Sequence, residues 1–477
     1  MIASCSSKDL PGNFLNQGKE MRAIMSPLLL MSLFSVAVAN RVYVHPFGMF
    51  ALENTTCVPV KAQAEKPLEM VALTPIEPHD SAEPDARTQE GSESPRQNVT
   101  QRSTVLAHLQ NNLGLRLYDA LRKQKPANTL FSPVSAYGAL VTLYLGASGS
   151  TAKQLQEFLG LGKETDTEDC ISPFDAHKVL RTLHSINSPQ DGATELRTHA
   201  WTFVSSKADL SKDFARGVQD FSDASYTRAV DLSQPQAAEA QVNSFIKRAT
   251  AGKIKQLFKD ISPSSDLLFA SSVHFKGDWR TAFQPEATSR QEFWITDNTS
   301  VIVPLMTHTG NYKYLDDKGR KCTVVKLPLS NKAHMLLVLP HEGTHLDHIE
   351  NQISDQISLI SDWSQHLKEG LLELSLPRFS MKGVSDLKSI ISDMKLASLL
   401  GTEAEFRKLS TKEHFRVGQV LNNVLFEMSE EGSAHQDKPQ GGHTATKLTV
   451  NRPFLFGVVE EDFEGILLLG RVTNPTL

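Results

Sequence analysis

Five consecutive residues, His341-Glu342-Gly343-Thr344-His345, have the types and spacing of a catalytic zinc site. They match the H-E-x-x-H motif of zinc proteases. That chemistry needs both histidines on one face of a helix, with the glutamate as general base. Here the motif follows the strand-like stretch MLLVLP and contains a glycine, and Thr344 with Asp347 is typical of a helix start. We therefore predict a polar loop with His341 outside the helix and no bound metal. The alternative, a zinc protease, requires metal that is lost on chelation.

Other catalytic motifs are missing from the sequence. It contains no G-x-S-x-G nucleophile elbow, no G-x-x-x-x-G-K-[ST] phosphate loop and no G-x-G-x-x-G fingerprint. Residues 146–149 read Gly-Ala-Ser-Gly, without the lysine that a phosphate loop needs. The sequence thus predicts a protein that is not an enzyme and needs no cofactor.

A second unusual stretch, NRVYVHPFGMF at residues 40–50, has neither helical nor strand periodicity. It follows a short positive start at Met21 and Arg22, the apolar run 24–38 and the small-x-small triplet that ends at Ala39. This order is typical of a signal peptide, and the run is shorter than the ~20 residues of a membrane span. We predict cleavage after Ala39, a mature chain that begins at Asn40, and secretion to the extracellular space. Residues 1–39 then form the signal region, with Met21 as a possible start.

Composition limits the partners of the 477-residue chain. Its net charge of -5 and pI near 6.4 argue against nucleic acid and against anionic membranes, which usually select a basic surface. Beyond the signal region three cysteines remain, Cys57, Cys170 and Cys322, which allow one disulfide and leave one thiol. The sequons at Asn54, Asn98 and Asn298 are expected glycan acceptors in a secreted protein.

Periodicity separates a loose N-terminal segment from a folded body. Residues 61–97 are rich in Pro, Glu, Asp and Ser, so we expect 50–100 to be a flexible, partly disordered tail. Leucines recur at helical spacing from Leu106 to Leu121, and strand patterns occur at 335–339 and 372–376. Residues 453–459 and 466–469 are expected to form a hairpin. We predict one mixed α and β domain over 101–477.

Three stretches of this body resemble the serpin family. Residues 128–155 contain Phe131-Ser132-Pro133 and Leu145-Gly146-Ala147, and residues 267–285 contain an F-K-G-x-W turn. Residues 451–460, with the tail 470–475, resemble the serpin C-terminal hairpin. The resemblance implies an α+β serpin fold, with a large central β-sheet, further sheets, surrounding helices and an exposed reactive-type loop behind a flexible N-terminal tail.

In the family's inhibitors, the cleaved reactive loop inserts into the central sheet as a new strand. Their hinge continues with small residues after Glu-Gly-Thr. Here Glu431-Gly432 is followed by Ser-Ala-His-Gln-Asp-Lys-Pro at 433–439, and the loop before Asn451 looks short. Either strand register would bury charged or polar groups, and Pro439 removes a hydrogen-bond donor. We therefore expect a non-inhibitory serpin; an inhibitor of a serine protease is the alternative.

Hormone-precursor members of the family resemble this chain at its mature N-terminus. The resemblance lies in Arg41, Val42, Tyr43, Val44, His45, Pro46 and Phe47. It implies that a renin-type aspartic protease cuts Met49-Phe50 and releases the decapeptide 40–49. A dipeptidyl carboxypeptidase then removes Gly48-Met49, which leaves residues 40–47 as a receptor agonist. It also implies a disulfide between Cys57 and Cys170 that ties the tail to the body.

The residue types suit these roles. Pro46 fixes its own φ and favours an extended His45, which lowers the ordering cost on binding. Tyr43 and Phe47 offer aromatic anchors, and Arg41 carries a permanent charge. Compared with the commonest family form, Asn40 replaces an aspartate and Gly48-Met49 replaces His-Leu.

Overall fold

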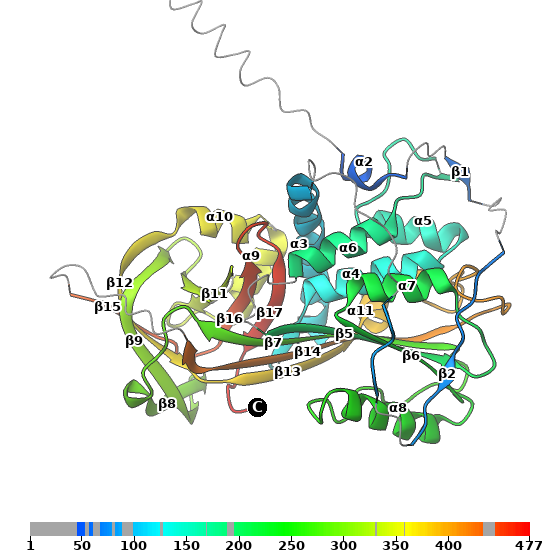
Figure 1. Cartoon of the computed structure of the whole chain (residues 1–477). Coiled ribbons are helices and arrows are strands. Elements are labelled where there is room, and N and C mark those ends of the chain that lie inside the picture. Colours follow the sequence, from blue (N-terminus) through cyan, green and yellow to red (C-terminus); the bar gives the residue numbers. More distant parts are fainter. Residues whose placement is uncertain are drawn as a thin grey trace, which may run out of the picture. The chain divides into compact units, whose positions relative to one another are not determined.

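Two large β-sheets, with helices on their faces, make up most of the described chain (Figure 1). The structure is a computed structural model that describes residues 45–52, 57–60, 67–78, 82–87, 99–124, 127–167, 169–187, 195–329, 332–356, 358–432 and 444–477. Contacts divide the chain into a unit of residues 1–45 and a unit of residues 46–477, to which the elements below belong. The predicted signal region 1–39 and residues 40–44 of the predicted hormone lie outside the described residues.

The six-stranded sheet has the order β13-β14-β7-β5-β6-β2. Its strands are β2 (Thr74–Pro75), β5 (Glu195–Ser205), β6 (Ala224–Val230), β7 (Leu267–Trp279), β13 (Ser380–Asp386) and β14 (Val417–Gly432). In its centre β14 pairs directly with β7 in parallel, from Val417 opposite Leu267 to Gly432 opposite Trp279. The predicted reactive-type loop follows β14, and residues 433–443 of it lie outside the described residues.

The nine-stranded sheet has the order β15-β12-β9-β10-β11-β16-β17-β3, with β8 paired to β9. Its strands are β3 (Thr129–Phe131), β8 (Ser289–Thr296), β9 (Thr299–Asp317), β10 (Cys322–Pro328), β11 (Ala333–Pro340), β12 (Lys368–Pro377), β15 (Thr446–Thr449), β16 (Phe454–Glu460) and β17 (Ile466–Val472). A small separate sheet joins β1 (Val58–Pro59) to β4 (Cys170–Ile171).

The helices begin with α2 (Pro46–Phe50), ahead of the body. The others are α3 (Val99–Gln124), α4 (Pro133–Gly146), α5 (Gly149–Phe158), α6 (Ala176–Asn187), α7 (Lys212–Phe221), α8 (Pro235–Ala249), α9 (Leu346–Asp355), α10 (Leu359–His366) and α11 (Leu387–Asp393), with short 3-10 turns at Pro285–Ala287 and Ala397–Leu399. Among the described residues no helix is long and apolar enough to cross a membrane.

Side chains alternate between the two faces of the six-stranded sheet, and the core is accordingly divided into two clusters. In β5, Ala200 and Val204 belong to the larger cluster, which contains α4 and α7, while Trp201 and Phe203 belong to the cluster around Phe245 of α8. Because successive side chains of a strand point to opposite faces, both faces of the sheet are covered. Figure 1 shows α4 and α7 on one face and α8 on the other.

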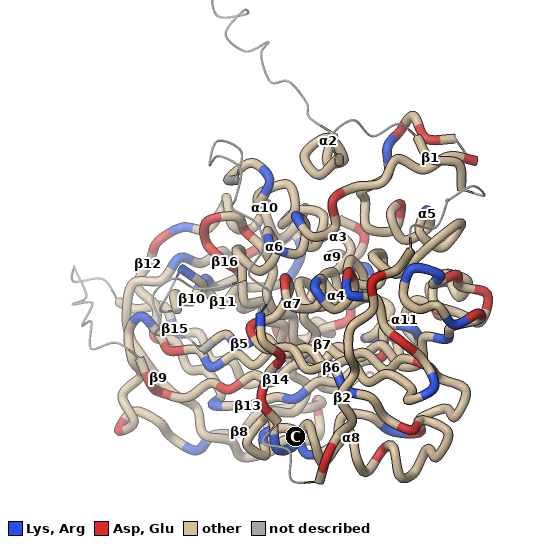
Figure 2. Tube along the Cα trace, turned by 45° about the vertical axis from the view of Figure 1, so that its right-hand side comes forward, with Lys and Arg blue, Asp and Glu red and all other residues tan. Residues whose placement is uncertain are grey.

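The predicted elements of the body are confirmed. The leucine stripe from Leu106 to Leu121 lies in α3, where most of these leucines are buried. The two predicted strands are parts of β11 and β12, and the predicted hairpin is the antiparallel pair of β16 and β17. Acidic and basic residues are interspersed along the trace (Figure 2).

Part of the predicted flexible tail packs on the body, so that expectation is wrong for residues 67–78 and 82–87. Strand β2 extends the six-stranded sheet beside β6, and Ile76 and Ala82 are buried against the α8 cluster. Arg228 of β6 holds the segment with an ion pair to Asp85 at 2.6 Å and a hydrogen bond to the carbonyl of Glu83 at 3.0 Å. The body supplies the apolar surface and hydrogen bonds that the segment itself lacks.

Candidate functional site

The predicted scissile bond, Met49-Phe50, lies in the short helix α2. The helix begins with Pro46, which suits a first helical position because the missing N–H has no helical partner there. Phe47 is 7% exposed and Phe50 is 0% exposed, whereas Gly48 is exposed and Met49 is half-buried. The sequence shows no helical periodicity over residues 40–50, so this helix was not predicted. Two aromatic residues three positions apart share a helix face, which lets both pack on the body.

The contacts that hold α2 in place include the following. The amide of Asp175 donates to the Phe50 carbonyl at 2.7 Å, and Ala51 forms an isolated β-bridge with Phe174. The Nζ of Lys163 lies 5.8 Å from the centre of the Phe47 ring, within cation–π range. We call the surface formed by Lys163, Phe174 and Asp175, on which α2 packs, the dock. Phe174 stacks on Tyr144 of α4 with ring centres 4.3 Å apart, so the dock is continuous with the core. In this arrangement the Met49-Phe50 bond is helical and partly covered.

Order-of-magnitude contributions can be compared for the docked arrangement of α2. Burial of two phenylalanine side chains contributes about 3–6 kcal/mol. Ordering the five residues of α2 costs about 5–10 kcal/mol of backbone entropy, which the Asp175 hydrogen bond and the cation–π contact offset by about 1–2 kcal/mol. The opposing contributions are similar in size. We therefore expect the segment to open from its docked helix to an extended form.

The implied disulfide is present between Cys57 and Cys170, whose Cα atoms are 5.6 Å apart. It fastens Cys57, seven residues after Phe50, to strand β4, which precedes α6. Strands β1 and β4 pair beside it, and the amide of Val60 donates to the carbonyl of Asp169 at 2.8 Å. The disulfide therefore restricts how far the segment can move away from its dock.

Asp175 offers a way to weaken the dock without touching the scissile residues. Its carboxylate also caps α6, because it accepts from the amide of Lys178 at 2.9 Å. Asp175→Ala removes only this cap, whereas Asp175→Pro also removes the amide that holds Phe50. A backbone hydrogen bond contributes about 0.5–1.5 kcal/mol, so we expect renin to cleave the proline variant about two- to tenfold faster than the alanine variant. If renin cleaved the proline and alanine variants at equal rates, and their melting temperatures were equal, the Asp175 amide would not hold α2 on the dock.

His177 fixes the start of α6 against α7 and provides a pH-dependent prediction. Burial opposes its charge, but Asp213 at 2.9 Å and Asp220 at 2.7 Å outweigh burial and raise the pKa of His177 to about 9. Because the folded pKa lies above the unfolded value of ~6.5, this stabilisation is complete below pH ~6.5 and is lost as pH rises through about 9. We expect the melting temperature to fall over that range, and less so in His177→Gln. If the melting temperatures of the parent and of His177→Gln fell equally with pH, this role of His177 would be contradicted.

The other predicted site residues are spread widely. Ala39 and the hormone residues 40–44 lie outside the described residues, as do the sequons at Asn54 and Asn98. Asn298 is exposed in the turn between β8 and β9, where a glycan has room. Cys322 is buried, and burial raises its pKa to about 12, which disfavours the reactive thiolate.

The H-E-x-x-H pattern lacks the geometry of a zinc site. His341 lies in the loop before α9 and pairs with Asp316 at 2.9 Å, and Gly343 has a positive φ of 75°. The cap is His345, one residue later than the predicted Thr344, and the helix begins at Leu346. His341 is therefore outside the helix, as the sequence predicts, and the two histidines do not share a helical face.

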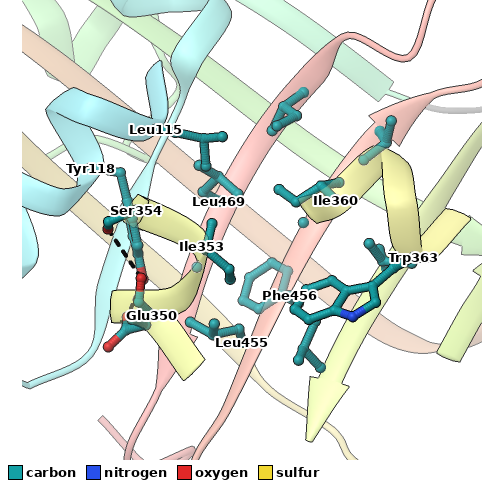
Figure 3. Close-up of a pocket in the computed structure, with 16 residues that line it drawn as sticks. Leu115, Tyr118, Glu350, Ile353, Ser354, Ile360, Trp363, Leu455, Phe456 and Leu469 are labelled. Atoms are coloured by element: carbon teal, nitrogen blue, oxygen red, sulfur yellow. Dashed lines mark hydrogen bonds between the residues drawn. The ribbon is translucent and has the colours of Figure 1, made fainter. Parts of the chain in front are cut away.

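A small apolar cavity lies between α3, α9, α10 and the β16–β17 hairpin (Figure 3). Its volume is about 40 Å³, whereas sites for drug-sized ligands hold roughly 300–1,000 Å³. The buried carboxylate of Glu350 at its wall accepts from the Tyr118 hydroxyl at 2.8 Å and pairs with Arg471 at 3.1 Å. Burial raises the pKa of Glu350, and Arg471 opposes this shift. We assign the cavity to core packing.

The residues of the body that contact α2 and the residue after it could not be identified from the sequence. Lys163, Phe174 and Asp175 carry no motif, and each lies more than 100 positions from its partner. The spacing of Phe47 and Phe50 and the position of Pro46 ahead of them were the local signals that favoured a helix.

Comparison with known proteins agrees with the fold. Residues 108–475 match the family described as "Serpin (serine protease inhibitor)". The chain is 31% identical to the angiotensinogen of Bos taurus over 468 residues, which covers 94% of this chain and 97% of the bovine one. It is 29% identical to the angiotensinogen of Homo sapiens over 481 residues, which covers 96% and 98% of the two chains.

Solved structures of other proteins have a similar fold. Mouse protein Z-dependent protease inhibitor superposes with a TM-score of 0.70 at 25% identity and covers 80% of this chain and 100% of its own. Human thyroxine-binding globulin gives 0.68 at 26% identity, with 78% and 99% covered. The names of these relatives and neighbours are those of angiotensinogens, a protease inhibitor and a hormone-binding globulin, and none of them is the name of an enzyme. With its α+β fold, its family match and its similarity to angiotensinogens, the chain belongs to the serpin family.

Proposed function

We propose that the chain is a secreted peptide-hormone precursor. Renin cleaves Met49-Phe50 and releases the decapeptide 40–49, and angiotensin-converting enzyme removes Gly48-Met49. The octapeptide 40–47 then acts on angiotensin receptors as a vasoactive hormone in blood pressure regulation. One observation carries the proposal: NRVYVHPF follows a predicted signal cleavage site on a serpin chain that is similar to angiotensinogens over more than nine tenths of its length.

The residues of the segment support this assignment. Aspartic proteases bind an extended substrate, and Met49 and Phe50 place apolar side chains on both sides of the bond. Within the octapeptide Arg41, Tyr43 and the terminal carboxylate of Phe47 offer a cation, an aromatic anchor and an anion for a receptor. In the precursor α2 must open before the bond becomes extended, so docking limits release. Glycans at Asn54, Asn98 and Asn298 fit a secreted protein, and the one at Asn54 would lie near the bond.

The body has a non-inhibitory role in this proposal. Its hinge carries His435, Asp437, Lys438 and Pro439, which suit neither register of an inserted strand. We expect trypsin and chymotrypsin to form no SDS-stable covalent complex with the protein. Cleavage within residues 433–445 should also leave the melting temperature unchanged, because no strand is inserted. A stable complex of higher mass with either protease would support the alternative, an inhibitory serpin.

A receptor assay tests the function itself. Secreted protein is treated with renin and angiotensin-converting enzyme, and the mixture is applied to cells that carry an angiotensin receptor. The proposal predicts signalling equal to that of an equimolar synthetic octapeptide 40–47, and none from untreated protein. Absence of signalling from the synthetic octapeptide would exclude the hormone role.

A further inference from the structure

The two cysteines of the disulfide have a third potential metal ligand beside them. One ligand atom from each of Cys57, Asp166 and Cys170 lies within 4.8 Å of the others. All three residues are half-buried. Two sulfurs and one carboxylate oxygen are a donor set that binds zinc-like divalent ions when the sulfurs are thiolates.

The Asp166 carboxylate is held in a fixed orientation. The amide of Ser172 donates to its Oδ2 at 2.8 Å, and the Ser172 hydroxyl donates to its Oδ1 at 2.7 Å. Ser172 itself is completely buried. Hydrogen bonds of this kind orient a ligating carboxylate and leave it with lone pairs for a metal.

The frame around the two cysteines does not depend only on the disulfide. Strands β1 and β4 pair Val58 with Ile171 and Pro59 with Cys170, and the amide of Val60 donates to the carbonyl of Asp169. These backbone contacts keep the two chain segments together when the sulfurs are reduced. The Cα atoms, 5.6 Å apart, are then close enough for both sulfurs to reach one ion, since a Zn–S bond is ~2.3 Å long.

We propose that the reduced form of the protein binds one zinc-class divalent ion through Cys57, Cys170 and Asp166. A phosphine or a thiol supplies two electrons, and the disulfide takes up two protons to become two thiols. The ion then replaces the two thiol protons, which are released to solvent, and accepts an oxygen of Asp166. Water completes the tetrahedral coordination. The proposal stands on these residues and does not rest on the hormone function.

Cobalt is the probe, because Co²⁺ reports thiolate coordination by absorption. Full-length protein with the Cys322→Ser change is reduced with a phosphine, freed of reductant without air and titrated with Co²⁺. We expect one ion per chain, with thiolate-to-cobalt charge-transfer absorption in the near ultraviolet and tetrahedral bands in the visible. Excess Zn²⁺ should abolish these bands. The oxidised protein should show none of them.

Variants decide between the proposed site and accidental binding. Cys170→Ser should abolish the charge-transfer band, and Asp166→Asn should weaken Co²⁺ binding at least about tenfold while its amide oxygen can still accept from Ser172. Asp169→Asn, which changes a neighbouring exposed carboxylate, is the matched control and should bind as the parent does. Disulfide formation in each oxidised carboxylate variant shows that it is folded. Equal affinity in Asp166→Asn, or no band in the reduced parent, would overturn the site.

Discussion

Replacing Met49 by aspartate is expected to abolish release of the decapeptide by renin. The substituted side chain would enter an apolar protease subsite as an unpaired charge. Such burial costs several kcal/mol, which lowers kcat/KM by a factor of about a hundred or more. Met49 is half-buried and is not one of the two phenylalanines that hold α2, so the body should stay folded. The measurement is the rate at which the decapeptide forms at equal protein concentration.

Met49→Leu is the matched control for this change. Leucine keeps an apolar side chain of similar volume, so release should continue within a few-fold of the parent rate. Release from the aspartate variant at the parent rate would show that Met49 does not flank the cleaved bond.

Breaking the disulfide is expected to accelerate release. Native disulfides typically contribute about 2–4 kcal/mol, and loss of even 1.4 kcal/mol from the docking of α2 raises the open population about tenfold. If opening limits cleavage, the release rate rises by the same factor. The test compares renin cleavage of the oxidised protein with that of Cys170→Ser and of reduced protein kept free of divalent metal.

Cys322→Ser is the control for effects of thiols in general. Cys322 is buried in β10 and forms no disulfide, so its replacement should leave the rate unchanged. Equal rates for oxidised, reduced and Cys170→Ser protein would mean that the disulfide does not govern access to the bond.

Much of the fold could be predicted because its signals are local. The leucine stripe of α3 and the alternation in β12 reflect which face of each element is buried. The three serpin-like stretches are continuous in sequence, and each contains a run of buried residues. The disulfide was implied by the same family resemblance.

The dock and the packed tail could not be predicted, because they depend on contacts between distant residues. Asp85 has no local reason to be ordered, and its partner Arg228 lies 143 positions away. Likewise the backbone of Phe50 and Ala51 is held by Asp175 and Phe174, which lie just before α6. A composition rule counts only the apolar surface of the segment itself and not the surface that a folded body offers to it.

The most direct test of the account is mass analysis of the products after the secreted, oxidised protein is incubated with renin. The account predicts one released peptide, NRVYVHPFGM, and one remaining body whose first residue is Phe50. A body that begins elsewhere, or an intact protein after both renin treatment and reduction, would contradict the precursor function.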